Sequence, residues 1–211
     1  MKNMLTIRRN TLSACLAALL FSLAPLMAGA ADAPGPEQLI RDITNQVLTA
    51  IKQDPALKAG DRAKAMALAE AKILPHIDFV EATRLAAGRS WRSAAPEQRD
   101  RLVAAFRAML VRTYSAAVDA YRGQTMEVMP VQMATGAKEA TVRNRYIRPG
   151  TQPVVVAYSM HLTDSGWKIY DISVEGISLV INYRSEFEQI GRDAGIEGLI
   201  ARLEKQQARP R

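Results

Sequence analysis

Apolar residues early in the chain recur every three or four positions, which is the spacing of one face of an α-helix. The positions are Ile40, Ile43, Val47 and Ile51. This pattern predicts an amphipathic helix that begins at Glu37 and ends at the Asp54-Pro55 pair.

Two shorter helices are predicted next from residues that cap helix ends. Asp61 can cap the first, which Pro75 ends, and Asp78 can cap the second, which reaches about Ala87. Gly88 follows at once and is a natural stop for that helix.

The longest predicted helix covers residues 95–121 and spans roughly 40 Å at ~1.5 Å per residue. It carries two neighbouring apolar stripes. The first is Leu102, Phe106, Met109, Thr113 and Ala117, and the second is Val103, Leu110, Tyr114, Val118 and Tyr121. Two adjacent stripes predict one wide buried face.

From residue 125 the period changes to two, which is typical of β-strands. Four strands are predicted, at residues 125–131, 139–147, 153–163 and 166–174. A tight turn at Asp164-Ser165-Gly166 joins the last two. The short connections predict an antiparallel meander.

Residues 171–187, DISVEGISLVINYRSEF, begin as a strand and continue as a helix, predicted over residues 178–193. A last helix is predicted over residues 196–206. Residues 177–181 are apolar nearly all round, whereas a surface helix shows one apolar stripe. The order of elements predicts an α+β fold: helices, a four-stranded antiparallel sheet, then helices again.

The first 30 residues have the pattern of a secretory signal peptide. Lys2, Arg8 and Arg9 precede an apolar run over residues 12–27, and Ala28-Gly29-Ala30 is a small-residue cleavage site. Cleavage after Ala30 leaves 211 − 30 = 181 residues, which we expect to form a single domain, residues 31–211.

Removal of the signal peptide changes both the thiol content and the charge. Cys15 is the sole cysteine, so the mature chain has no disulfide, cysteine nucleophile or thiolate metal ligand. The formal net charge falls from +7 to +4, because the signal peptide carries three basic residues and no acid. Basic residues are interspersed with acidic ones, so we expect no nucleic-acid binding.

Candidate catalytic groups are few. His76 and His161 are the only histidines, and no spacing typical of a metal site or of a nucleophile motif occurs. His161 alternates with Met160 and Leu162, which predicts a side chain that faces solvent. Asp171 is either a buried general base or a carboxylate that bonds the backbone or an arginine; the lack of a second catalytic group favours the latter.

The other notable feature is a set of apolar residues that carry no catalytic group. Alternate strand positions hold Met126, Val128, Val142, Tyr146, Tyr158, Met160 and Leu162, and the long helix presents Tyr114, Val118 and Tyr121. Periodicity alone does not separate a solid core from a core with an apolar slot.

Several motifs resemble the MlaC family over residues 37–203. They are GRSW at 88–91, PEQR at 96–99 leading to Tyr114-Ser115, GWKIYDI at 166–172, VEGISLV at 174–180, NYRSEF at 182–187, and the Gly195-Ile196 to Leu199-Ile200 segment. The resemblance implies a helical layer packed on a twisted antiparallel sheet, with the acyl tails of a lipid in an apolar pocket between them and the head group outside.

The same resemblance implies a periplasmic, non-enzymatic carrier of glycerophospholipids that maintains outer-membrane lipid asymmetry. Its implied partners are an outer-membrane lipoprotein–porin complex and the periplasmic ring of an inner-membrane ABC transporter. We expect a monomer without a cofactor. The predicted lipid-lining residues are Leu110, Tyr114, Val118, Met126, Val128, Val142, Tyr146, Tyr158, Met160, Ile172, Val174, Ile177, Val180 and Ile181.

Two alternatives remain at this point. One is a small-molecule enzyme of the isomerase or dehydratase type on a conical α+β fold, which needs Asp171 or His161 in a pocket beside a tyrosine. The other is a periplasmic adaptor that binds only proteins, which predicts a solid core without a cavity.

Overall fold

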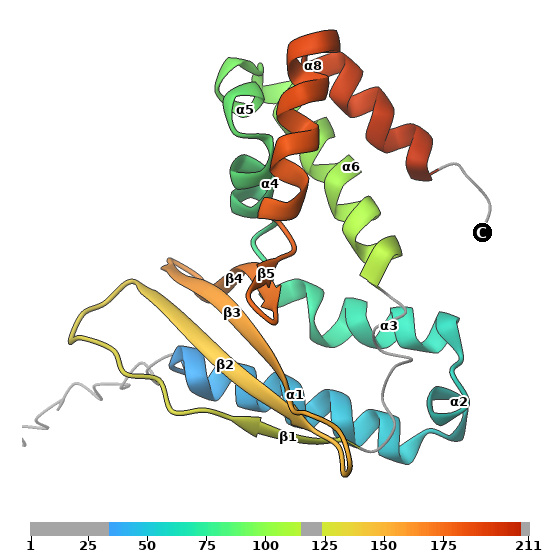
Figure 1. Ribbon diagram of the computed structural model, residues 1–211, viewed down its shortest axis with the longest axis vertical. Helices are drawn as coiled ribbons and strands as arrows, with labels where there is room; N and C mark the ends of the chain where they lie inside the picture. The colour runs from blue at the N-terminus through green and yellow to red at the C-terminus, as the bar shows by residue number, and fades with distance from the viewer. Residues whose placement is uncertain (1–33, 115–123, 208–211) are drawn as a thin grey trace, which may run out of the picture. The chain divides into compact units, whose positions relative to one another are not determined.

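The structure is a computed structural model that describes residues 34–114 and 124–207 (Figure 1). Helices form the first half of this part of the chain. They are α1 (Pro36–Gln53), α2 (Pro55–Lys58), α3 (Arg62–Lys72), the 3₁₀ turn η1 (Leu74–His76), α4 (Phe79–Ala87), α5 (Arg89–Ser93) and α6 (Pro96–Tyr114). The predicted helices at α1, α3 and α4 are confirmed, and Asp61 and Asp78 accept the backbone N–H groups of Lys64 and Glu81 as predicted caps.

The short helices α2 and α5 were not predicted. In α2 the Asp54 carboxylate accepts the Ala56 N–H at 2.8 Å, so the residue expected to end one helix also caps the next. The predicted signal peptide, Val118 and the predicted helix end at Tyr121 lie outside the described residues.

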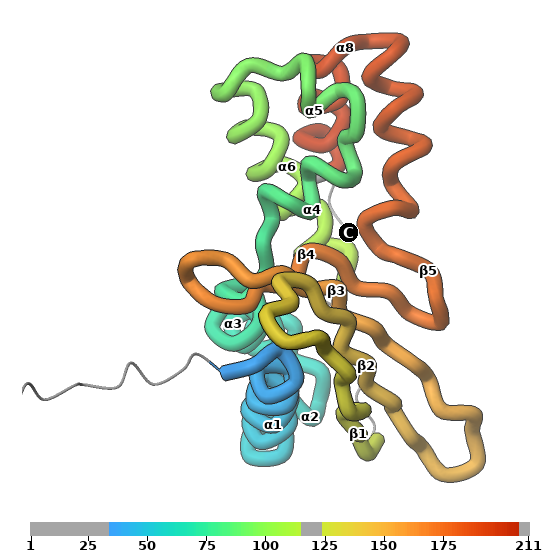
Figure 2. The backbone as a smooth tube through the Cα atoms, turned by 90° about the vertical axis from the view of Figure 1, so that its left-hand side faces the viewer, coloured from blue at the N-terminus to red at the C-terminus, as the bar shows by residue number. Residues whose placement is uncertain are grey.

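Five strands form one antiparallel sheet in chain order (Figure 2). They are β1 (Thr125–Val128), β2 (Glu139–Ile147), β3 (Val154–Thr163), β4 (Gly166–Val174) and β5 (Ile177–Ser178). The α+β prediction is confirmed, and the sheet has one strand more than predicted. The bounds of β2 and β4 are those predicted.

The helix predicted from residue 178 begins later than predicted. Glu175 and Gly176 have φ angles of 50° and 81°, which make a tight turn that folds Ile177–Ser178 back onto β4. The 3₁₀ turn η2 (Ile181–Tyr183) follows, and α8 (Arg184–Gln207) begins only there.

Gly195 interrupts α8, with φ 66° and ψ −173°. An L-residue rarely adopts this conformation, whereas glycine does so at little steric cost. The interruption falls between the two helices that the sequence predicted at residues 178–193 and 196–206.

Two apolar clusters form the core within the part of the chain that the structure describes. In the helical cluster, Phe106 of α6 packs edge-on against Tyr183 and Phe187, with ring centroids 5.6 Å and 5.2 Å apart. Helices α4, α6 and α8 supply most of this cluster. In the sheet cluster, Ile40 of α1 packs with one face of the sheet.

Asp78 connects the start of α4 to the sheet. Its N–H donates to the Ile169 carbonyl at 2.8 Å, and its carboxylate both caps α4 and lies 3.0 Å from Nε2 of His161. The prediction that His161 faces solvent was therefore wrong: its side chain is only 26% exposed, because the Asp78 carboxylate at the start of α4 holds it.

Asp171 has a structural partner as well. Its Oδ1 accepts the Val180 N–H at 3.1 Å, which fixes the turn between β5 and η2. This is the backbone-bonded carboxylate that the sequence favoured over a general base. Within the described ranges, none of the helices combines the length and hydropathy needed to cross a bilayer.

We predict that Asp78→Ala destabilises the protein more than Asp61→Ala does. Both changes remove a helix cap, at about 1 kcal/mol each, but only Asp78 also bonds a side chain of the sheet, which contributes about 1 kcal/mol more. Urea unfolding followed by circular dichroism gives both free energies of unfolding. Equal losses would contradict the proposed role of Asp78 in joining α4 to the sheet.

Candidate functional site

One face of the sheet is apolar along most of its width. Because directly paired residues project to the same side, the pairing of Val142 with Tyr158 and of Tyr158 with Ile172 places these three in one row. The next row along the strands holds Asn144, Val156, Val174 and Ile177.

Protein packing covers part of this face. Helix α1 contacts β1 and β2, and Ile40 packs with Val142, Met160 and Ile169. Val142 and Met160 are 0% exposed, so these two predicted lining residues lie within the core. Val128 is buried in the same cluster.

Beyond this cluster the same face reaches solvent. Val154, Val174 and Ile177 on this face are 41%, 37% and 64% exposed, and Ile181 of η2, which contacts β5, is 45% exposed. They are four of the seven large apolar side chains exposed in the described ranges. Val174 pairs directly with Ile177, and Val154 lies diagonally across from Val174. We call these four residues the apolar patch. Contiguous exposed apolar surface marks binding sites, whereas scattered single residues do not.

A polar group of side chains lies on the apolar face next to Val156 and Val154. The Tyr146 and Tyr158 hydroxyls are 3.0 Å apart, and Nδ2 of Asn144 lies 3.4 Å from Oγ1 of Thr44 on α1. Burial, with the Tyr146 hydroxyl beside it, raises the pKa of Tyr158 well above its usual value. Asn144 is 0% exposed, and its Oδ1 has no hydrogen-bond partner among the described residues.

The remaining predicted lining residues belong to different surroundings. Leu110 and Val180 pack in the helical cluster. Tyr114 is the last described residue of α6, and burial, followed by a hydrogen bond with Tyr183, raises the pKa of its hydroxyl. Met126 and Tyr146 are paired and half-buried on β1 and β2. The residues thus fall into the sheet core, the helical core and the exposed end of the sheet.

Val154 belongs to the apolar patch but was not among the predicted lining residues. It stands two positions before Val156 and four before Tyr158 on β3, so strand alternation alone places it on the same face. The polar Asn144 on this face was not predicted as a site residue, although it stands two positions after Val142 and so shares its face.

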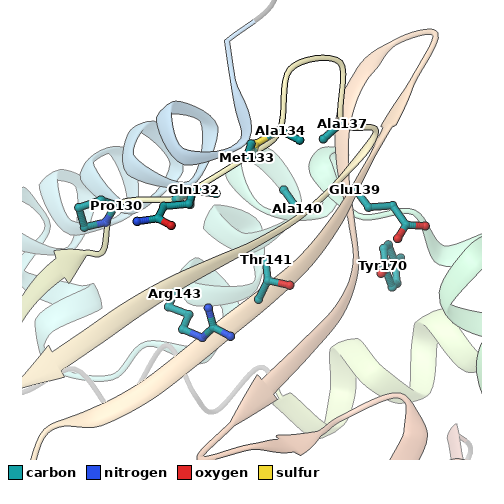
Figure 3. A pocket seen from close by; sticks show the side chains of 11 residues that line it. Pro130, Gln132, Met133, Ala134, Ala137, Glu139, Ala140, Thr141, Arg143 and Tyr170 are labelled. Carbon is teal, nitrogen blue, oxygen red and sulfur yellow. The ribbon is translucent and has the colours of Figure 1, made fainter.

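A separate hollow of about 620 Å³ lies at the edge of β2, beside the β1–β2 connection (Figure 3). Glu139, Thr141 and Arg143 line it, and these alternate along β2 with the buried Val142. Charged and hydroxyl side chains at this wall do not suit acyl chains, since burying such groups without partners is costly. Tyr170 lines the hollow, but neither Asp171 nor His161 does.

The enzyme alternative needs one of these two groups beside a tyrosine in a pocket. His161 does lie edge-on to Tyr170, at 5.3 Å between centroids, but Asp78 holds its Nε2. Among the described residues, no cluster of three histidine, cysteine, aspartate or glutamate side chains could hold a metal ion.

Comparisons with known proteins agree with one another. Residues 41–205 match the family described as MlaC protein. The intermembrane phospholipid transport system binding protein MlaC of Haemophilus influenzae is 23% identical over 189 residues, which cover 88% of this chain and 82% of that protein. A phospholipid-binding protein of Ralstonia solanacearum, solved in complex with a phospholipid, is 32% identical with a TM-score of 0.75, covering 83% of this chain and 98% of that one.

We predict that the predicted lining residues differ sharply in their contribution to stability. Val142→Ala should lower the free energy of unfolding by about 2 kcal/mol, since it leaves a cavity in the sheet core. Ile177→Ala should change it by no more than about 0.5 kcal/mol, as for most exposed positions. Urea unfolding of the two variants measures this. Similar losses would show that Ile177 is packed core rather than accessible surface.

Proposed function

Because this chain belongs to the MlaC family, we propose that it carries a glycerophospholipid, with the acyl chains against the apolar face of the sheet. The observation that carries this proposal is the apolar patch, which continues a sheet face that is otherwise core. The phospholipid bound to the Ralstonia solanacearum protein, 32% identical to this chain, supports the same ligand class.

The energetics explain why such a carrier needs apolar surface and no catalytic group. A diacyl lipid that crosses water exposes about 30 methylene groups at ~0.8 kcal/mol each, of order 25 kcal/mol in total. Seating the chains on Val174 and Ile177 replaces one apolar environment with another. The free energy of transferring the lipid then approaches zero, and docking to a partner can set the direction of transfer.

The exposed and half-buried members of the predicted lining set toward the open end of the face are those that would touch the lipid. We assign the acyl contacts to Tyr158, Ile172, Val174, Ile177 and Ile181, with Val154 added from the structure. Buried residues such as Val142 and Met160 would instead hold the sheet in shape beneath the lipid. Tyr146 and Asn144 would lie where the apolar face becomes polar.

We further propose that the protein works in the periplasm after removal of residues 1–30, as a monomer. It would shuttle phospholipid between an outer-membrane lipoprotein–porin complex and the ring of an inner-membrane ABC transporter. The family membership and the name of the Haemophilus influenzae relative support this assignment. No covalent bond changes in this role, so the structural use of Asp78 and Asp171 is compatible with it.

The direct test is the lipid content of the purified protein. We predict that native mass spectrometry finds about one phospholipid per chain, and that protein stripped of lipid takes it up again from liposomes. Ile177→Glu should lower this occupancy about tenfold, since a carboxylate would have to be buried against the acyl chains.

Val80→Glu is the matched control, because Val80 is also exposed, at 54%, but lies on α4 outside the apolar patch. Both variants should unfold at urea concentrations close to that of the unaltered protein. An unaltered protein that is empty and takes up no lipid would refute the proposed function. Equal occupancy in the two variants would refute the assignment of the lipid to the apolar patch.

A further inference from the structure

The edge of β2 is only partly covered by β1. The paired residues of β1 reach from Ile147 to Asn144 on β2, and the Met129 N–H then donates to the Arg143 carbonyl at 2.8 Å. The chain leaves the sheet after that bond. The first residues of β2, from Glu139 to Val142, therefore have β3 on one side and no strand on the other.

Two features stop β1 from continuing along this edge. Pro130 has no N–H to donate. The Val131 N–H, which would stand opposite Thr141, donates instead to Oε2 of Glu37 on α1, at 3.2 Å. The Arg41 side chain and this N–H together hold the pKa of the Glu37 carboxyl below its usual value. Helix α1 thus draws the chain away from β2.

The ladder fixes which backbone groups face the uncovered side. The Arg143 carbonyl bonds toward β1, and the Lys138 carbonyl accepts the Leu162 N–H at 2.8 Å on the β3 side. Backbone groups alternate in direction along a strand, so the N–H and C=O of Thr141 point away from β3. Neither has a partner among the described residues.

Thr141 is also one of the residues that line the 620 Å³ hollow (Figure 3). Thr141 and the charged Glu139 and Arg143 form one wall, and Met133 and Ala137 of the β1–β2 connection lie among the residues of the other. The hollow therefore combines a polar strand edge with an apolar wall. It lies at the uncovered edge of β2: Glu139, Thr141 and Arg143 belong to the face opposite the apolar patch, whereas Ala140, which pairs with Met160, belongs to the apolar face.

We propose that this edge binds an extended peptide segment of a partner protein by strand addition. A neighbouring backbone at about 4.8 Å supplies the carbonyl and N–H that Thr141 lacks. Arg143 favours a segment with an acidic side chain at that end, and Met133 favours a small apolar side chain on the other wall. Charged residues at a strand edge also discourage unspecific pairing, so the charge pattern sets the selectivity. This proposal is independent of the lipid assignment.

The test uses a hexapeptide phage library selected on the full-length purified protein, with counter-selection on Thr141→Pro. Proline removes the N–H that points away from β3 and leaves the β2–β3 ladder unbroken, because the Thr141 N–H is not part of it. Thr141→Val is the matched control, since it keeps the N–H and alters only the side chain. Each selected peptide is also made with N-methyl groups that block its backbone donors.

We expect the selected peptides to contain an acidic residue. Their binding should reduce the rate of hydrogen exchange at the Thr141 amide. Their affinity should fall at least about tenfold on Thr141→Pro and on N-methylation, and stay within about twofold on Thr141→Val. The proposal would be overturned if the selection gave no peptide that prefers the unaltered protein. It would also be overturned if the N-methylated copies bound as tightly as the unmethylated peptides. The N-methylated arm decides the question even where Thr141→Pro fails to fold.

Discussion

The sheet has more apolar surface than the described part of the chain covers, and the proposed role depends on that imbalance. Helix α1 packs Ile40 against the part of the face that holds Val142 and Met160, and there the sheet is ordinary core. Farther along, Val174 and Ile177 stay exposed although they stand on the same face. Water contact at such a surface costs about 25 cal/mol per Å², so a ligand with long apolar chains is the natural cover.

The charged residues that first suggested chemistry serve the fold instead. Asp78 caps α4 and bonds His161, and Asp171 holds the turn before η2 through the Val180 N–H. Each carboxylate thus connects helical segments to the sheet. Glu37 of α1 acts in a comparable way, because its carboxylate accepts the Val131 N–H, which would otherwise face β2. A carrier needs such connections because it must keep an apolar face open without collapsing upon it.

Local pattern predicted most of the elements, because strand alternation and helix caps are set by neighbours in sequence. The bounds of β2 and β4 and the caps at Asp61 and Asp78 follow from it. The fifth strand was missed because it depends on the positive φ of Glu175, which a glutamate seldom adopts. Periodicity also could not separate buried Val142 from exposed Ile177, because both occupy apolar positions on the same face of the sheet. The edge at Thr141 depends on a contact between residues 94 positions apart, which no local pattern contains.

We propose that the lipid lies on the exposed end of the apolar face. Photo-crosslinking with a phospholipid that carries a diazirine in one acyl chain tests it most directly, with the labelled residues identified by peptide mass spectrometry. The label should fall on Val174, Ile177 and Ile181. Labelling concentrated at Met133 and Thr141, in the hollow at the edge of β2, would contradict this placement of the lipid.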